Sequence, residues 1–322
     1  MILKNKKHFF TETKRIVFIV SFLALSLIHF AVFWCYINFD TIRMTFFRVD
    51  KITHEEIFVG LEEYAILFRN IFLKEDIKAA NGFWNSFHAV SINLIILPIA
   101  VVVAYCFYKK VYGHKFFRII FYLPSVISIV VLAAAFREMF RQYNNGFETM
   151  EGPVAQILSL IGINKNWLDT MKDTEVKWPL IYTFAILNGM GANVILITSA
   201  MNRIPKEVSE ASRIDGAGFF REMTSVTIPL VMPTITTWVM MIFASVYSFF
   251  MQPMLIFDYN TGKDGMFSTT PMEIFNLVAG ESIGENNLLT AARLGIILTL
   301  IILPINLAMR ALLNRFTAEV SY

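Results

Sequence analysis

Long apolar blocks alternate with shorter polar segments along the chain. Six of these blocks reach or approach the ~20 residues that an α-helix needs to cross a ~30 Å bilayer core. They cover residues 16–37, 87–108, 119–136, 178–201, 235–257 and 294–313. The pattern predicts an all-α integral membrane protein with six transmembrane helices.

The composition supports the membrane class. Hydrophobic residues make up 56% of the 322 residues and charged residues only 16%, too few to cover a water-soluble surface. The net charge of +3 is too small to favour nucleic acid as a partner. Cys35 and Cys106 both lie inside apolar blocks, which disfavours a disulfide framework and a zinc site.

The distribution of charge predicts the orientation of the spans. If both termini lie on one side, that side carries 15 of the 28 Lys and Arg residues but only six of the 25 Asp and Glu residues. Basic residues collect on the cytoplasmic side of membrane proteins, so we expect both termini in the cytoplasm. Residues 1–15 would be a cytoplasmic N-terminus. Residues 16–37 would be a retained span, because the apolar run is too long for a signal peptide and no small-residue cleavage site follows it.

Three polar segments are then expected outside the cell, and the third of them, residues 258–293, is rich in Gly, Asn and Thr. Residues 38–84 form an external insertion, and an amphipathic stretch at 57–72 indicates a small helical cap. Residues 137–177 form a second segment, in which Gly152-Pro153 and the apolar run after them predict a short helix with proline at its first position.

The sequence contains no indication of catalytic chemistry. The phosphate-binding pattern G-x-x-x-x-G-K-[ST] is absent, so any ATP hydrolysis must come from another chain. No span has an acidic residue at its middle, which argues against proton or sodium coupling. The polar residues within the spans are neutral and suit a neutral polar solute. Hydrogen bonding between helices is the competing explanation for each of them.

The loop between the fourth and fifth spans, about residues 202–230, is the most informative stretch. Pro205 can begin a helix, Glu207 suits the positive N-terminal end of that helix, and Gly216 can end it in the left-handed conformation. We expect a short amphipathic helix on the cytoplasmic side that docks into a partner. A helix lying passively at the lipid interface is the alternative.

Three groups of residues in this loop closely resemble the EAA loop of permease subunits of binding-protein-dependent ABC importers. They are Glu210-Ala211-Ser212, Asp215-Gly216-Ala217 and Ile228-Pro229-Leu230. Ser212 stands where the family pattern E-A-A has its third residue. Similarity to the carbohydrate, MalF-like branch continues outside the loop, at Leu123-Pro124, at Asn188-Gly189 and at Asn85-Ser86-Phe87.

The resemblance implies a MalF-like type I permease fold over residues 85–322, in the bacterial cytoplasmic membrane. It implies as partners a second homologous permease, two ABC ATPase subunits and an extracellular solute-binding protein, besides the lipid bilayer. ATP and Mg would be held by the ATPase chains, so this chain would be a transport subunit without a cofactor of its own and not an enzyme. The implied function is import of a sugar or oligosaccharide. An ion-independent secondary carrier and a non-transporting membrane scaffold are the alternatives.

Two groups of residues are candidate sites. Coupling to the ATPase is expected of five residues in the EAA loop, Glu210, Ala211, Ser212, Asp215 and Gly216. A solute path is expected where amides and aromatic rings gather in spans four and five, because neutral sugars are held by hydrogen bonds and by rings against their apolar faces. This second group is Asn188, Asn193, Tyr247, Phe249 and Gln252, and helix packing is the alternative for each.

Overall fold

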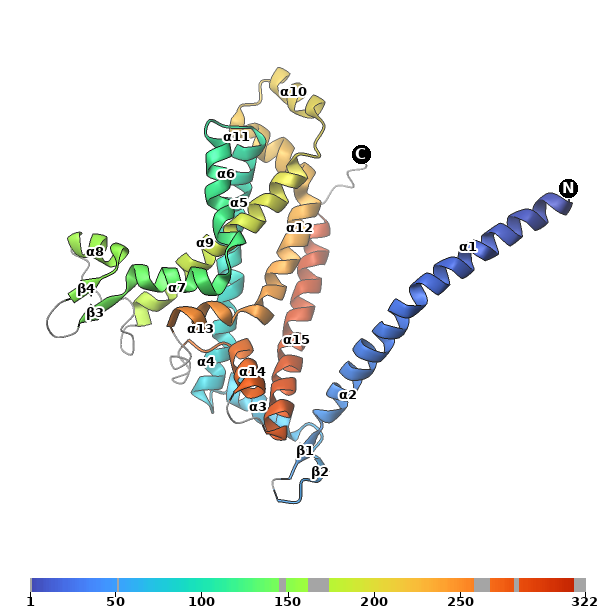
Figure 1. Cartoon of the computed structure of the whole chain (residues 1–322), viewed down its shortest axis with the longest axis vertical. Coiled ribbons are helices and arrows are strands. Elements are labelled where there is room, and N and C mark those ends of the chain that lie inside the picture. Colours follow the sequence, from blue (N-terminus) through green and yellow to red (C-terminus); the bar gives the residue numbers. More distant parts are fainter. Residues whose placement is uncertain are drawn as a thin grey trace. The chain divides into compact units, whose positions relative to one another are not determined.

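The computed structural model describes residues 2–50, 52–144, 149–161, 174–257, 267–280 and 284–315. These residues are mostly helical (Figure 1). Five helical segments among them are long and apolar enough to cross a membrane, or six if one bent pair counts as a span. The five are Lys14–Met44, Ile77–Tyr108, Trp178–Met201, Phe219–Ser248 and Glu285–Asn314. The expected all-α membrane class is confirmed.

The chain divides into two compact units. The first unit comprises Met1–Ile66 and Leu277–Ile296, and the second comprises Leu67–Asn276 and Ile297–Tyr322. Three helices belong to both units: α3 (Glu62–Phe72), α14 (Thr270–Ala279) and α15 (Glu285–Asn314).

A single long rod begins the first unit (Figure 1). It is made of α1 (Ile2–His29), the π-helical stretch η1 (Phe30–Tyr36) and α2 (Ile37–Met44), which follow one another without a break. None of the residues in its apolar window is buried. Because apolar side chains cover residues 16–37 of the rod on all sides, this stretch requires lipid or protein around it rather than water.

An antiparallel hairpin follows the rod, made of β1 (Phe47–Val49) and β2 (Glu56–Phe58). The prediction of a helical cap within 38–84 is therefore wrong in part. Helix α2 extends to Met44, and a hairpin precedes α3. The amphipathic stretch 57–72 begins as a strand and becomes a helix only at Glu62.

The turn of this hairpin is closed by side chains, which explains why hydrophobic periodicity did not reveal it. The Asp50 carboxylate accepts hydrogen bonds from the backbone N–H groups of Ile52 at 2.7 Å and Thr53 at 3.1 Å. These bonds hold the pKa of Asp50 below its ordinary value. His54 takes the left-handed conformation with a φ of 55°.

The elements that lie wholly in the second unit are, in chain order, α4 (Ile77–Ser86), α5 (His88–Tyr108), α6 (His114–Val126), α7 (Ile129–Phe140), β3 (Gln142–Asn144), β4 (Thr149–Glu151), α8 (Pro153–Leu160), α9 (Thr174–Met201), α10 (Lys206–Ile214), α11 (Phe219–Glu222), the π-helical η2 (Met223–Thr227), α12 (Ile228–Ala244), the 3₁₀-helical η3 (Ser245–Ser248) and α13 (Met251–Phe257). Strands β3 and β4 form a second antiparallel hairpin. The expected short helix with proline at its first position is confirmed as α8. Other parts of the expected segment 137–177 lie outside the described residues.

The core of this unit is the packing of α5 along α9. Two glycines of α9 permit close approach of its neighbours. A Cβ on Gly189 would lie 3.1 Å from Cδ1 of Ile96 in α5, and one on Gly191 would lie 2.5 Å from the carbonyl oxygen of Phe121 in α6. Any larger residue at Gly191 would push α6 away from α9.

The third span is not the single helix expected over 119–136. Helices α6 and α7 meet at an angle of 105°. Ile127 and Ser128 between them have extended backbones, with ψ angles of 143° and 132°. Two extended residues end a helix completely, whereas the sequence shows only Pro124, which could equally produce a mild kink.

The fifth span also differs from the expected range 235–257, which is wrong at both ends. The membrane-length segment is Phe219–Ser248, and the chain turns at Phe249 before α13 begins. Pro253 has no N–H with which to bond the Phe249 carbonyl four residues earlier, so a continuous helix would leave that carbonyl unpaired. The hydroxyl of Thr269 donates to it instead, at 2.7 Å.

Candidate functional site

Helix α10 forms where the loop between spans four and five predicts it. Pro205 is its N-cap residue, Glu207 lies in its first turn, and Gly216 follows its end with a φ of 78°. A positive φ is easily adopted only by glycine, so this residue sets the point at which the helix stops. The expected bounds and both terminal signals are confirmed.

The structure places four of the five expected coupling residues on the surface. Glu210, Ala211, Asp215 and Gly216 are exposed. Ser212, the departure from the family pattern, is buried with 7% of its surface exposed, and its hydroxyl donates to the Ser209 carbonyl at 2.9 Å. Two of the expected coupling carboxylates are therefore exposed, Glu210 in α10 and Asp215 just after it, whereas Ser212 faces the interior.

A buried ion pair beneath α10 was missed by sequence reasoning. Glu222, at the end of α11, is only 4% exposed and pairs with Lys109 at the end of α5. Ser209 of α10 donates to the same carboxylate oxygen at 2.8 Å. In the sequence both charges stand beside apolar runs like ordinary boundary residues, and no spacing links positions so far apart.

The expected solute-path residues of α9 are partly buried. Asn193 uses its amide within its own helix, where Nδ2 donates to the Gly189 carbonyl at 2.8 Å. Asn188 is half-buried one turn earlier.

The other three expected path residues are placed by the break after span five. Tyr247 in η3 is 39% exposed and Phe249 is 4% exposed. Gln252 lies in α13, which packs against α9. Its Oε1 is buried and has no hydrogen-bond partner among the described residues, which is unusual for a buried amide.

A cavity of about 250 Å³ lies in the second unit beside α9 and α12. Its lining includes Leu196, Trp238 and Met241, with Thr234 and Thr237 as polar groups. None of the five expected path residues lines this cavity.

Hydrogen bonding between helices accounts for some of the polar residues within the spans. Asn93 of α5 donates through Nδ2 to the Ser245 hydroxyl of η3 at 3.1 Å. Asn306 of α15 donates to the Met240 carbonyl of α12 at 3.2 Å. For these residues the helix-packing explanation is the one that the structure supports.

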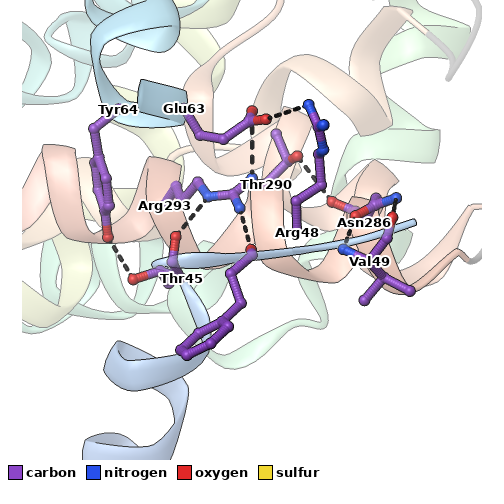
Figure 2. A network of polar contacts seen from close by, with 9 residues as sticks. Thr45, Arg48, Val49, Glu63, Tyr64, Asn286, Thr290 and Arg293 are labelled. Carbon is purple, nitrogen blue, oxygen red and sulfur yellow. Dashed lines mark hydrogen bonds and ion pairs between the residues drawn. The ribbon is translucent and has the colours of Figure 1, made fainter. Parts of the chain in front are cut away.

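A polar network in the first unit surrounds a buried arginine. Figure 2 shows Arg293 of α15 directed toward Glu63 of α3 and toward the segment that leads into β1. Arg293 is 2% exposed, and its Nη1 lies 3.6 Å from the Glu63 carboxylate. It also donates to the carbonyls of Thr45 at 2.9 Å and Phe47 at 2.6 Å.

The network also includes hydrogen bonds from a side chain to the backbone of β1 (Figure 2). The Asn286 amide accepts from the Val49 N–H at 3.0 Å and donates to the Val49 carbonyl at 2.8 Å, as a neighbouring strand would. Tyr64 donates to the Thr45 hydroxyl at 2.6 Å. The start of α15 is thus the framework on which the hairpin is built.

Fold and site together define a helical multi-pass membrane protein that presents a short polar helix beyond its spans. The chain belongs to the binding-protein-dependent transport system inner membrane component family, whose model matches residues 96–321. The matched range includes α10 and both groups of candidate residues. The family expected from the EAA loop is confirmed.

Several curated relatives are sugar permeases by name. The chain is 27% identical over 304 residues to the arabinooligosaccharides transport system permease protein AraP of Halalkalibacterium halodurans, covering 93% of this chain and 86% of AraP. It is 28% identical to the multiple sugar-binding transport system permease protein MsmF of Streptococcus mutans, covering 67% and 69%. It is 25% identical to the diacetylchitobiose uptake system permease protein NgcF of Streptomyces coelicolor, covering 81% and 71%.

Two solved structures have a similar fold. A bacterial ABC transporter involved in the import of the acidic polysaccharide alginate matches with a TM-score of 0.76 and 20% identity, covering 97% of this chain and all of that chain. The alginate transporter in complex with an alginate pentasaccharide-bound periplasmic protein matches with a TM-score of 0.76 and 21% identity, covering 95% and 97%. At this identity the likeness concerns the fold.

Proposed function

We propose that the chain is the permease subunit of an ATP-driven importer that takes up a sugar or oligosaccharide. The observation that carries the proposal is α10, a helix that ends at a left-handed glycine and exposes the residues of the EAA pattern. The choice of carbohydrate follows the names of AraP, MsmF and NgcF, which all concern sugars. The neutral polar residues within the spans agree with such a solute.

The proposal includes partners that carry the energy source and the solute. A second homologous permease would complete the membrane path, and two ABC ATPase subunits would bind ATP and Mg. An external solute-binding protein would deliver the sugar. The alginate transporter is likewise solved in complex with an alginate pentasaccharide-bound periplasmic protein. The exposed carboxylates of Glu210 and Asp215 suit a basic surface on an ATPase.

The orientation of the chain follows from these partners and from the charge distribution. Helix α10 and both termini would face the cytoplasm, and the hairpin of β1 and β2 would face outward. ATP binding would draw the two ATPases together and displace α10. The spans attached to α10 would then move between outward-open and inward-open states.

Transport by the complete complex in liposomes tests the proposal. The chain is co-purified with its partner permease and ATPases and reconstituted with ATP inside the vesicles. The solute-binding protein and a labelled sugar, selected by thermal shift of the binding protein, are added outside. We expect uptake that requires both ATP and the binding protein.

Other outcomes of this assay distinguish the alternatives. Uptake that continues without ATP or binding protein would indicate a secondary carrier. A complex that binds its partners but moves no solute would indicate a scaffold. ATP-dependent uptake of amino acids or ions in place of sugars would contradict the substrate class while leaving the importer mechanism intact.

A further inference from the structure

Three segments of the second unit meet at one buried polar cluster, the Lys109–Ser209–Glu222 triad. Lys109 follows the last residue of α5, Ser209 lies in the middle of α10, and Glu222 ends α11. The Lys109 ammonium forms an ion pair with Glu222 and donates to the Ser209 hydroxyl at 2.8 Å. Ser209 in turn donates to Oε1 of Glu222 at 2.8 Å.

The triad is enclosed by protein. The side chains of Lys109 and Glu222 are only 10% and 5% exposed. The rings of Tyr105 and Tyr108 lie 5.7 Å and 5.5 Å from the Lys109 ammonium and offer it their negative faces. Arg213 of α10 contributes a further positive charge that acts on Glu222.

Stability alone does not account for such a pair. Taking two opposite charges out of water is costly, and apolar residues of similar volume are often at least as stabilising. Buried ion pairs are best attested where they fix the register of one element against another. The triad joins α5, α10 and α11, and α10 has only Ser212 as a buried residue. The pair therefore suits the role of fixing α10 against the other two segments.

The connections of the triad lead into the membrane. Within α10, Ser212 is the one buried residue, so the triad is a main attachment of this helix to the spans. Helix α5 packs along α9, which carries Asn188 and Asn193. Helix α11 continues through η2 directly into α12 of the fifth span.

We propose that Lys109, Ser209 and Glu222 are positioning residues that make α10 move together with the second and fifth spans. None of them is assigned a contact with solute or nucleotide. The inference rests on the proposed importer function and adds to it the joint through which displacement of α10 reaches the membrane helices. Without the joint, α10 could follow an ATPase while the spans stayed in place.

The test removes the two charges together. Either Lys109→Met or Glu222→Gln alone leaves one buried charge unpaired, and such variants are expected to fold poorly. The double variant Lys109→Met/Glu222→Gln leaves no charged side chain in the triad and therefore no unpaired charge, so we expect normal membrane insertion and complex assembly. The solute transported per ATP hydrolysed should fall by about two- to thirtyfold, the usual range for a residue on a coupling network.

A matched control uses an ion pair that is exposed. Glu138 and Arg141 of α7 pair at 3.0 Å with side chains 64% and 55% exposed. The double variant Arg141→Met/Glu138→Gln makes the same two chemical changes and should leave the transport ratio at the wild-type value. A Lys109→Met/Glu222→Gln variant that assembles and keeps the wild-type ratio would overturn the inference.

A distance measurement tests the joint without depending on transport. Spin labels are attached at Lys206 of α10 and at Tyr112, just beyond α5, both exposed, after Cys35 and Cys106 are replaced. The distance distribution should be narrow in the wild type and broader in the Lys109→Met/Glu222→Gln variant. Equal widths would overturn the inference, whereas a wild-type complex without ATP-dependent uptake would contradict only the proposed function.

Discussion

At Gly216 the effect of a substitution on the backbone can be separated from its effect on side-chain packing. Its φ is 78°, and a Cβ built on it would meet no atom within 4 Å. A substitution there acts through the backbone alone, because a side chain with a β-carbon disfavours the left-handed conformation by roughly 1–2 kcal/mol. The residue therefore reports on the conformation of the end of α10 and not on any contact with the rest of this chain.

We expect Gly216→Val to reduce solute uptake relative to ATP hydrolysis while the chain remains in the membrane. Strain at the end of α10 would shift Glu210 and Asp215 against the ATPase. Uptake and hydrolysis are measured in the same proteoliposomes. Gly218→Val is the control, since Gly218 has a φ of −71° and equally free space around it. Equal ratios in the two variants would contradict the assigned role of Gly216.

Gln252 is the one expected path residue with a buried side-chain atom that lacks a hydrogen bond among the described residues. Its buried Oε1 lacks a hydrogen-bond partner among the described residues. A buried polar group left in this way costs about 1–3 kcal/mol. Proteins tolerate that cost where a group serves a ligand, so the amide suits a hydrogen bond with a passing hydroxyl.

The variant Gln252→Leu should keep or raise the thermal unfolding temperature of the complex and yet lower uptake across a range of sugar concentrations. The stability follows because a buried amide oxygen without a partner is removed, and the loss of uptake follows if the amide binds solute. Thr198→Val provides the control, because the Thr198 hydroxyl is also buried and unpartnered but belongs to no expected path. Wild-type uptake by Gln252→Leu would remove this residue from the path.

At the scale of the element, the break after span five depends on one hydroxyl from a distant segment. Thr269 donates to the Phe249 carbonyl at 2.7 Å and also accepts from the Met272 N–H at 3.3 Å at the start of α14. Ser86 holds the same segment by accepting from the Thr270 N–H at 2.8 Å. The turn between α12 and α13 is thus fixed from outside its own sequence.

Thr269→Val should destabilise the complex by about 1–3 kcal/mol, because it leaves the buried Phe249 carbonyl without a donor. Thr269→Ser retains the hydroxyl and should recover most of the stability. Thermal unfolding in detergent measures both. Thr237→Val is a control in which the lost hydroxyl serves only its own helix and is exposed. Similar unfolding temperatures for all four proteins would contradict the assigned role of Thr269.

Arg293 plays a comparable part for the first hairpin. We expect Arg293→Gln to loosen β1 and α3, because two carbonyls and part of the Glu63 charge lose their partner. Breaking a buried pair generally costs about 3–5 kcal/mol, and Arg48, 3.5 Å from Glu63, should reduce this cost. Limited proteolysis between β1 and β2 provides the measurement. Arg310→Gln, an exposed change later in the same helix, should leave the rate of cleavage unchanged.

At the scale of the whole molecule, the orientation of the spans can be tested by labelling. Single cysteines at Lys110 and Lys206 should be protected from an impermeant thiol reagent in intact cells, and one at Glu55 in the first hairpin should react. The background carries replacements of Cys35 and Cys106. All three positions should react after the membrane is permeabilised. Reaction of the first two in intact cells would reverse the proposed orientation.

The sequence by itself determined the membrane class, most of the spans and the helix α10. These features depend on local properties: the length of an apolar run, a proline that begins a helix and a glycine that ends it. The same local patterns carry the family resemblance. They could be read because each depends on residues within one or two turns of each other.

The tertiary structure alone decided where two spans break and which charges are buried. The hydroxyl of Thr269 donates a hydrogen bond to the Phe249 carbonyl. Lys109 forms an ion pair with Glu222, and Arg293 forms one with Glu63. Partners separated by 20 to 230 residues have no periodicity that links them. Whether a carbonyl or a charge can leave water depends on a partner supplied by the fold, and that partner is visible only once the chain has packed.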